Sequence, residues 1–279
     1  MLGAIMGDVI GSRYEFYNHR SKEFELFHPV CTFTDDTVLT IATAKALLAN
    51  YPFELNEKGI NKIKKDLVDN YLVAVNKYPD AGYGGRFYNW IAFDDKHLPY
   101  NSFGNGSAMR VSSVGWLAKT LVECKLLARI TAEVTHNHPE GIKGAEAIAV
   151  AIFLARQGKT KEEIKEYIYD NYYPELDYFS YDELVETNKF NETCQGSVPQ
   201  AIYCFLISES YEDAFRTAVS IGGDTDTIAC MAGAIAEAYY KDIDVLNKEF
   251  LSHNYLPQEF LDVVNRLNNT INNSYSSQP

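Results

Sequence analysis

The 279-residue sequence lacks any long apolar run: no stretch approaches the roughly 18 to 20 consecutive apolar residues of a membrane-spanning helix. Residues 1–11 have no basic residue before their apolar run, and Asp8 interrupts that run, which argues against a secretory signal. Cysteines are few: the five are odd in number, scattered, and without a C-x-x-C pair. This usage is typical of reduced thiols, so we predict a cytoplasmic protein with no membrane partner.

Positive charge is also scarce. The chain has 25 Lys and Arg against 38 Asp and Glu, which gives a formal net charge of -13 and a pI near 4.9. Such a balance argues against a surface that neutralises nucleic-acid phosphates or docks on anionic lipid, so a nucleic-acid partner is not expected. Neither G-x-x-x-x-G-K-[ST] nor a strand-linked G-x-G-x-x-G occurs, and an ATP or dinucleotide fold is therefore not indicated.

Strand-like alternation is scarce, whereas apolar residues recur at helical spacing in residues 38–49, 142–152 and 228–236. Similar patterns predict further helices over residues 3–12, 56–75, 84–93, 107–119, 122–134, 161–169, 181–189, 199–207, 212–220, 245–251 and 257–265. No Pro/Ser-rich linker divides the chain, and no internal repeat of fixed period is present. We predict an all-α fold, a single compact bundle of roughly a dozen or more helices. The bundle would span residues 1–266, with a frayed polar tail over 267–279.

Two short windows each combine two aspartates with two threonines where a loop turns into an apolar helix: T-D-D-T at 34–37 and D-T-D-T at 224–227. Helix capping explains either window alone. Thr34 would be an N-cap with Asp35 and Asp36 in the first helical turn, and Asp224 would cap a later helix.

The presence of two windows favours a metal site. If the helix starts converge, four carboxylates meet in one cavity, and bound cations would relieve their repulsion. Adjacent residues at a helix start point about 100° apart, so Asp35 and Asp36 would hold two neighbouring ions, or one ion and a water. With the hydroxyls of Thr34 and Thr227 the donors are all oxygen, which favours Mg, Mn or Ca over Zn. We expect two Mg ions, with Mn as the alternative.

Two glycine-rich segments, G-Y-G-G-R at 82–86 and N-S-F-G-N-G-S at 101–107, each precede a helical pattern. Small residues there would let backbone N–H groups approach an anion such as a phosphate. An ordinary turn explains the first segment better, whereas the second has more small polar residues than a connection requires. His136 lies in a loop, where it either lines a pocket or is satisfied structurally. Glu15 follows a helix of small residues and would by default be a surface glutamate.

In chain order, these segments resemble the motifs of the ADP-ribosylglycohydrolase family. The matching segments are G-D-x-x-G-S-x-Y-E near the N-terminus, T-D-D-T, S-F-G-N-G-S-A-M-R, T-H before a helix, and G-G-D-T-D-T-I-A. Each motif is weak alone, but five in order are specific, and they run from Gly3 to about Tyr240.

The resemblance implies an all-α bundle with a binuclear Mg centre in a cleft, which removes ADP-ribose from modified side chains or related acceptors. It implies six metal ligands: Thr34, Asp35, Asp36, Asp224, Asp226 and Thr227. The catalytic residues would be Glu15, Asp35 and Asp36, with Glu15 moving a proton beside the metals. Substrate binding would fall to Ser102, Phe103, Gly104 and Asn105 in a diphosphate-binding loop, to His136 near the substrate, and to Gly82, Gly84 and Gly85 at the cleft rim.

We therefore expect a Mg-dependent hydrolase that cleaves the bond at the anomeric carbon of ADP-ribose on a mono-ADP-ribosylated acceptor, such as an arginine or serine side chain. One alternative is a hydrolase of a small ADP-ribose conjugate or another nucleoside diphosphate sugar. A second is a non-catalytic module that binds ADP-ribose, and a third is a structural helical domain whose aspartates are caps.

Overall fold

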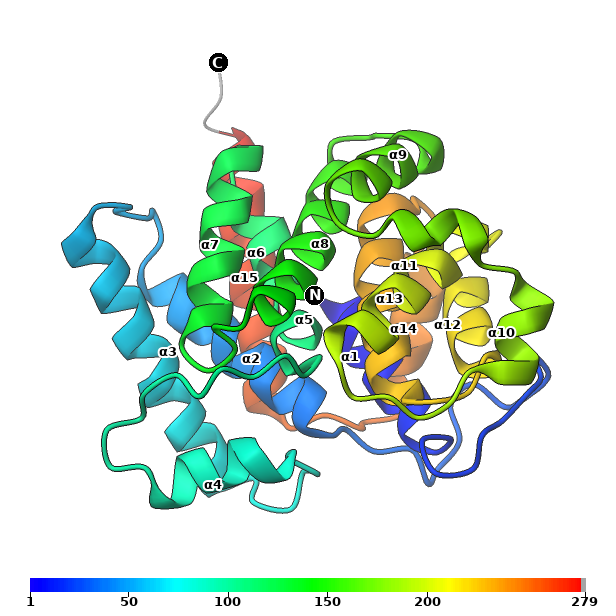
Figure 1. The fold of residues 1–279 in the computed structure, drawn as a ribbon, viewed down its shortest axis with the longest axis horizontal. Helices are drawn as coiled ribbons and strands as arrows, with labels where there is room; N and C mark the ends of the chain where they lie inside the picture. The colour runs from blue at the N-terminus through cyan, green and yellow to red at the C-terminus, as the bar shows by residue number, and fades with distance from the viewer. Residues whose placement is uncertain (277–279) are drawn as a thin grey trace.

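The computed structural model describes residues 1–276, which fold almost entirely into helices (Figure 1). In chain order these are α1 (Leu2–Ser12), α2 (Asp35–Ala49), α3 (Glu57–Lys77), α4 (Gly85–Phe93), α5 (Gly106–Met109), α6 (Ser112–Leu117), α7 (Leu121–Glu133), α8 (Pro139–Arg156), α9 (Lys161–Asn171), the 3-10 helix η1 (Pro174–Tyr178), α10 (Tyr181–Thr187), α11 (Cys194–Ile207), α12 (Tyr211–Ser220), α13 (Thr225–Tyr239), α14 (Asp244–Ser252) and α15 (Gln258–Ser276). Over this range the only β-type pairing is an isolated bridge between Gly104 and Thr193. The all-α prediction is confirmed.

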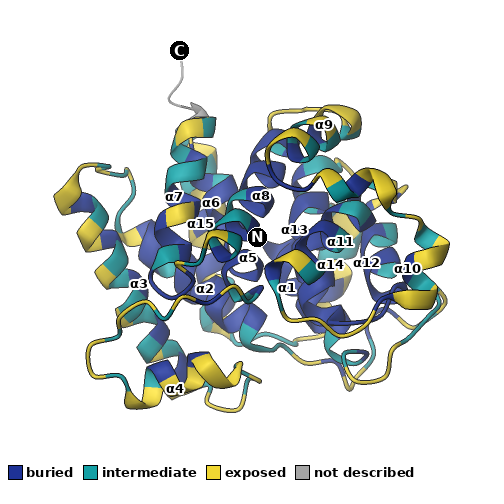
Figure 2. Ribbon diagram, viewed as in Figure 1, coloured by how far each residue is buried: buried dark blue, intermediate teal, exposed yellow. Residues whose placement is uncertain are grey.

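Helices α1, α8 and α13 occupy the middle of the molecule (Figure 1). Helices α2, α3, α4, α6, α7 and α15 lie to one side of them, and α9 to α12 lie to the other. Buried residues concentrate in α1, α2, α8 and α13, whereas α4 and α10 at the periphery carry much of the exposed surface (Figure 2). Within residues 1–276, no helix combines the length and apolarity required to cross a membrane.

Helix α1 packs more extensively against α13 than any other helix pair does, although more than 200 residues separate them in the chain. The glycines of α1 explain this close approach. A Cβ added to Gly7 would lie 2.0 Å from the carbonyl oxygen of Ala229, and one added to Gly11 would lie 2.4 Å from the Cα of Asp226. Any side chain at these positions would force the helices apart. The contact therefore places the C-terminal end of α1 beside the first turn of α13.

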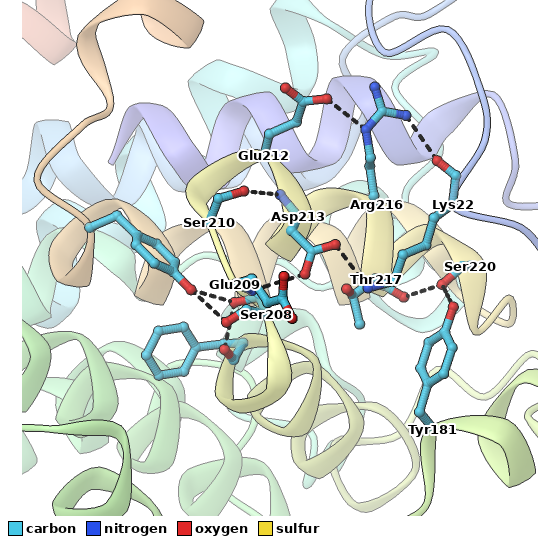
Figure 3. A network of polar contacts seen from close by, with 12 residues as sticks. Lys22, Tyr181, Ser208, Glu209, Ser210, Glu212, Asp213, Arg216, Thr217 and Ser220 are labelled. Carbon is cyan, nitrogen blue, oxygen red and sulfur yellow. Dashed lines mark hydrogen bonds and ion pairs between the residues drawn. The ribbon is translucent and has the colours of Figure 1, made fainter.

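A polar network ties α12 to the segment that follows α1 (Figure 3). Arg216 donates to the carbonyl oxygens of Lys22 and Phe24 at 2.9 and 2.8 Å. The ammonium of Lys22 lies 2.8 Å from a carboxylate oxygen of Asp213, on the same helix as Arg216. Because α12 leads directly into the turn before α13, this network fixes the position of that turn relative to the loop after α1.

The expected helix over 107–119 is divided into α5 and α6. Arg110 and Val111 have φ/ψ of -90°/0° and -85°/-4°, outside the regular α-helical range, so the chain changes direction between the two helices. Helix α11 begins earlier than expected, because Thr193 caps it by accepting a hydrogen bond from the N–H of Gly196 at 3.2 Å. Neither deviation changes the fold class, but the first places Arg110 beneath the cleft described below.

The prediction of a frayed polar tail from residue 267 is wrong for the described part of that segment. Helix α15 continues to Ser276, and Leu267 is completely buried. Phe260, Val263, Val264 and Leu267 form one buried face at helical spacing, so the pattern that predicts a helix over 257–265 extends beyond its expected end. Residues 277–279 of the expected tail lie outside the described residues.

Candidate active site

A cleft of about 290 Å³ brings together residues from most of the length of the chain. The cleft is lined by every residue that the sequence analysis singled out except Thr34: Glu15, Asp35, Asp36, Gly82, Gly84, Gly85, Ser102, Phe103, Gly104, Asn105, His136, Asp224, Asp226 and Thr227. The starts of α2 and α13 form one part of its wall, and the loops before α4, α5, α8 and α11 form the remainder.

The N-termini of α2 and α13 converge on the cleft. Thr34 is the N-cap of α2 and accepts a hydrogen bond from the N–H of Asp36 at 3.3 Å, as the capping interpretation predicts. From the start of α13, the hydroxyl of Thr227 donates to a carboxylate oxygen of Asp36 at 3.0 Å. Asp36 and Asp226 are both buried. The two aspartate windows therefore meet in space.

Capping does not account for Asp224. This residue occupies the N-cap position of α13, but its side chain makes no capping hydrogen bond. One of its carboxylate oxygens instead accepts a hydrogen bond from the Asn105 side chain at 2.7 Å, across the cleft. The same amide group also lies 3.1 Å from the hydroxyl of Ser197. The structure thus directs Asp224 into the cleft and links it to the glycine-rich loop.

The carboxylates form two overlapping groups, Asp8 with Asp36 and Asp226, and Glu15 with Asp224 and Asp226. Within each group, one oxygen from every member lies within 4.8 Å of the others. Burial, followed by repulsion from neighbouring carboxylates, raises the pKa of Asp36 well above its usual range. Burial likewise raises the pKa of Asp224 to about 6. Carboxylates this close require protons or cations between them.

The donor set fits a divalent metal ion. The candidate ligands are carboxylates and hydroxyls, the oxygen chemistry that Mg and Mn prefer. A buried carboxylate oxygen of Asp36, Oδ1, has no hydrogen-bond partner within residues 1–276, so it retains its full capacity to coordinate a cation. The acidic end of the cleft could therefore hold metal.

Glu15 lies in the turn after α1 and is partly buried. Burial, together with repulsion from the carboxylates of Asp226 and Asp8, raises the pKa of Glu15 from 4.5 to about 7. A carboxyl group with a pKa near neutrality can both accept and donate a proton under physiological conditions. Its surroundings distinguish Glu15 from an ordinary surface glutamate.

The first glycine-rich segment borders Asp35. The N–H of Asp35 donates to the carbonyl oxygen of Ala81 at 2.7 Å, and a Cβ added to Gly82 would lie 3.8 Å from a carboxylate oxygen of Asp35. A Cβ at Gly84 or Gly85 would meet no atom within 4 Å, so both residues face open space at the cleft edge. This segment forms a rim beside the acidic end.

The second glycine-rich loop is braced by the segment before α11. The N–H of Asn105 donates to the carbonyl oxygen of Glu192 at 2.8 Å, and the N–H of Gly104 donates to the hydroxyl of Ser102 at 3.2 Å. Two N–H groups of the loop are thus used within the protein, which limits the backbone donors available to an anion. Phe103 is partly exposed at this edge of the cleft, at 39%.

Two arginines, Arg86 and Arg110, also line the cleft. Arg86 donates to the carbonyl oxygen of Tyr100 at 2.6 Å and lies over the ring of that tyrosine. Arg110 lines the cleft from beneath. Burial, with the charges of these two arginines, lowers the pKa of His136 well below its usual range, so this imidazole is neutral. By contrast, His138 caps α8 by accepting a hydrogen bond from the N–H of Glu140.

Sequence reasoning missed several residues of the site. Asp8 and Arg110 both lie within quoted motifs, and the signal for Asp8 was a carboxylate inside an apolar helix. Glu192, Phe190 and Thr193 also line the cleft. These last three have no distinguishing sequence pattern, because only the long-range contact of their loop with residues 103–105 brings them to the cleft.

Comparison with known proteins agrees with this geometry. The family model for ADP-ribosylglycohydrolase matches residues 1–274. The ADP-ribosylhydrolase ARH3 of Mus musculus is 28% identical, over 86% of this chain and 82% of its own length. The ARH3 of Xenopus tropicalis is also 28% identical, over 93% of this chain and 91% of its own length.

A solved structure described as an ADP-ribosylglycohydrolase-related protein complex has a similar fold. It superimposes with a TM-score of 0.67 at 23% identity and covers 97% of this chain and 93% of its own. The family match spans nearly the whole sequence and includes every element that lines the cleft. The chain therefore belongs to the ADP-ribosylglycohydrolase family and is a hydrolase of ADP-ribose glycosidic bonds.

Proposed function

We propose that the protein is a Mg-dependent hydrolase that releases ADP-ribose from a mono-ADP-ribosylated acceptor, such as an arginine or serine side chain, by cleaving the bond at the ribose anomeric carbon. The observation that carries this proposal is that one cleft is lined both by a cluster of carboxylates and by two arginines. ADP-ribose combines ribose hydroxyls, which a metal centre can bind, with an anionic diphosphate. The carboxylates and the arginines of the cleft complement these two parts.

At the acidic end, the residues proposed to hold two Mg ions are Thr34, Asp35, Asp36, Asp224, Asp226 and Thr227, with Mn as the alternative ion. Bound divalent ions would polarise ribose oxygens and orient the sugar for attack by water. The hydroxyl hydrogen of Thr34 points to Asp8, so an oxygen lone pair of Thr34 remains for a cation. In this assignment Asp35 and Asp36 count among the catalytic residues because they would hold the ions that bind the reacting sugar.

Glu15 is the proposed proton-transfer group. Cleavage at the anomeric carbon passes through an oxocarbenium-like state, and either the leaving atom or the attacking water must exchange a proton. With a pKa of about 7, Glu15 is poised to do so near neutral pH. Its position in the same carboxylate group as Asp224 and Asp226 supports this assignment.

The proposed contacts to the diphosphate come from Ser102, Phe103, Gly104, Asn105 and His136, which line the same cleft. Gly82, Gly84 and Gly85 would shape the rim near the scissile bond. Binding energy from the diphosphate and adenosine would then hold the ribose in the correct position relative to Glu15.

The five free and buried cysteines support our further proposal that the protein works in a reducing compartment such as the cytoplasm.

A panel of differently linked substrates tests the proposal. Mg-loaded protein would be incubated with arginine-linked and serine-linked ADP-ribosyl peptides, a small ADP-ribose conjugate and a nucleoside diphosphate sugar, and released ADP-ribose would be quantified. Release from a peptide, abolished in Asp226→Asn, supports the proposal. Release from the small molecules alone would transfer the activity to soluble conjugates, and binding without release from any substrate would indicate a sensor of ADP-ribose.

A further inference from the structure

Arg110 is the largest fully buried side chain among the residues whose burial the structure describes, and the hydrogen-bond partners of its guanidinium are neutral. The group donates to the hydroxyl of Thr135 at 2.7 Å and to the carbonyl oxygen of Thr131 at 3.2 Å, and its carbon lies 4.7 Å from the centre of the Tyr71 ring. Within residues 1–276, its Nε and Nη1 atoms have no hydrogen-bond partner. A buried cation without a carboxylate is strongly disfavoured unless another negative charge compensates it.

Thr135 lies between Arg110 and His136 and forms a hydrogen bond with each of them. These two hydrogen bonds indicate which ring nitrogen of His136 carries the hydrogen. Arginine can only donate, so the Thr135 oxygen accepts from Arg110. The same oxygen lies 2.7 Å from Nδ1 of His136. Thr135 has one hydroxyl hydrogen, and Nδ1 is the partner toward which it can donate. The arrangement that leaves no hydroxyl hydrogen unpaired makes Nδ1 the acceptor, and in it the neutral imidazole carries its hydrogen on Nε2.

Nε2 of His136 faces the glycine-rich loop. It would lie 3.3 Å from a Cβ added to Gly106 and 3.5 Å from a Cβ added to Gly104. Within the described residues, Nε2 makes no hydrogen bond to a protein atom, yet it is not sealed from solvent like the buried polar atoms without a partner. The Nε2 hydrogen thus faces the cleft beside the glycine-rich loop.

We propose that Arg110 is a positioning residue for the diphosphate of ADP-ribose: acting through Thr135, it fixes His136 as an Nε2–H donor and supplies the buried positive charge that the anion compensates. This inference rests on the proposed function, because that function provides the diphosphate. The Nε2–H group would also add a hydrogen-bond donor for the diphosphate. The glycine-rich loop has few donors to offer, because the N–H groups of Gly104 and Asn105 already bond within the protein.

We call the chain of hydrogen bonds from Arg110 through Thr135 to His136 the relay. It would give His136 a single tautomer, which a free histidine lacks. An unconstrained neutral imidazole distributes its hydrogen between two nitrogens, whereas the chain from Arg110 selects one tautomer and one ring orientation. The donor would then be in place before the ligand binds, which reduces the free energy needed to order the site. A guanidinium at the far end of the chain also polarises each hydrogen bond toward the ligand.

The tautomer itself is measured by long-range proton–nitrogen NMR of the folded protein without ligand, with the His136 signals assigned by their loss in His136→Gln. We expect a hydrogen on Nε2 in the wild type and in Thr135→Ser, and a mixture of tautomers in Thr135→Val. A hydrogen on Nδ1 in the wild type would overturn the inference. This measurement requires neither metal nor substrate, so it stands even if the proposed function fails.

Binding is then compared by calorimetry on the Mg-loaded protein, with ADP-ribose and adenosine as probes. Thr135→Val should weaken the binding of ADP-ribose about 10-fold, because it removes a hydrogen bond. Arg110→Met should weaken it about 10- to 100-fold, because it removes a charge. Adenosine should bind all variants alike, and Thr135→Ser should restore ADP-ribose affinity.

Thr131→Val is the matched control, because the hydroxyl of Thr131 donates to the carbonyl oxygen of Ala128 on the same helix and does not join the relay. Equal loss of ADP-ribose affinity in Thr131→Val and Thr135→Val would reduce the relay to general packing and overturn the inference. If the wild type binds no ADP-ribose at all, the proposed function falls, while the tautomer measurement still decides the proton position.

Discussion

Thr34 donates its hydroxyl hydrogen to Asp8 across 2.7 Å, from the start of α2 to the middle of α1. The second carboxylate oxygen of Asp8 accepts from the backbone N–H groups of Thr34 and Thr37, at 2.9 and 3.0 Å. A completely buried side chain of one helix thus satisfies the N-terminus of another. Because both oxygens of Asp8 are used in this way, we infer that it fixes Thr34 and the first turn of α2 beside the proposed metal ligands.

Asp8→Asn should therefore destabilise the fold. The amide can accept on one side only and presents N–H hydrogens to groups that themselves donate, so we expect a loss of about 1 to 3 kcal/mol in the free energy of unfolding. Mg affinity measured by calorimetry should fall as well. Asp69→Asn is the control, since it removes an exposed i,i+4 partner of Lys65 and should change stability by less than about 1 kcal/mol. Equal effects of the two variants would contradict the role of Asp8.

The stability of the metal-free protein should fall as pH rises from about 4 to 7. Folding raises the pKa of Asp224 from 3.8 to about 6 and that of Glu15 from 4.5 to about 7. In this window the folded protein binds more protons than the unfolded chain, so deprotonation favours unfolding. Urea unfolding in EDTA at several pH values measures the slope, which Asp224→Asn should flatten and saturating Mg should suppress. A wild-type slope in EDTA no steeper than that of Asp224→Asn would contradict the assignment.

Mg should raise the melting temperature of the wild type, because an ion that binds only the folded state stabilises it. The increase should grow as pH rises, because protons compete with Mg for carboxylates whose pKa burial raises, and EDTA should reverse it. Asp36→Ala should remain folded and helical by circular dichroism but lose most of the Mg response. A full response in Asp36→Ala would show that Mg binds elsewhere.

Glu15→Gln tests proton transfer. The amide preserves size and hydrogen bonding but cannot accept a proton, so turnover should fall about 10²- to 10⁴-fold. ADP-ribose affinity should change little, because ground-state contacts remain. Measuring both quantities across a Mg titration separates this role from metal coordination: partial rescue by excess Mg would make Glu15 a ligand, and near-normal turnover would end the proton-transfer proposal.

The sequence was sufficient to predict the fold class and most helices, because the periodicity of apolar residues directly reflects burial on one helical face. It failed where tertiary contacts override local pattern. The continuous helical pattern over 107–119 breaks at Arg110, whose guanidinium donates to Thr135, beyond the end of α7. The segment from residue 267 onward has a polar composition, yet Leu267 completes the buried face of α15.

The same distinction applies to the site. Aspartate windows and glycine-rich loops are local signals, so most cleft residues could be named from the sequence. The role of Asp8 depends on the approach of α1 to α2 and α13, and that of Glu192 on a backbone contact with Asn105. No local pattern encodes such pairings between distant segments.

The most direct test of the central claim is Mg-dependent release of ADP-ribose from a mono-ADP-ribosylated peptide by the wild type and by Asp226→Ala, with folding of both verified by circular dichroism. Asp226 belongs to both carboxylate groups, so the account predicts release by the wild type in Mg, none in EDTA, and none by the variant at any Mg concentration. Wild-type rates from Asp226→Ala, or undiminished release in EDTA, would contradict a metal-dependent hydrolase centred on these carboxylates.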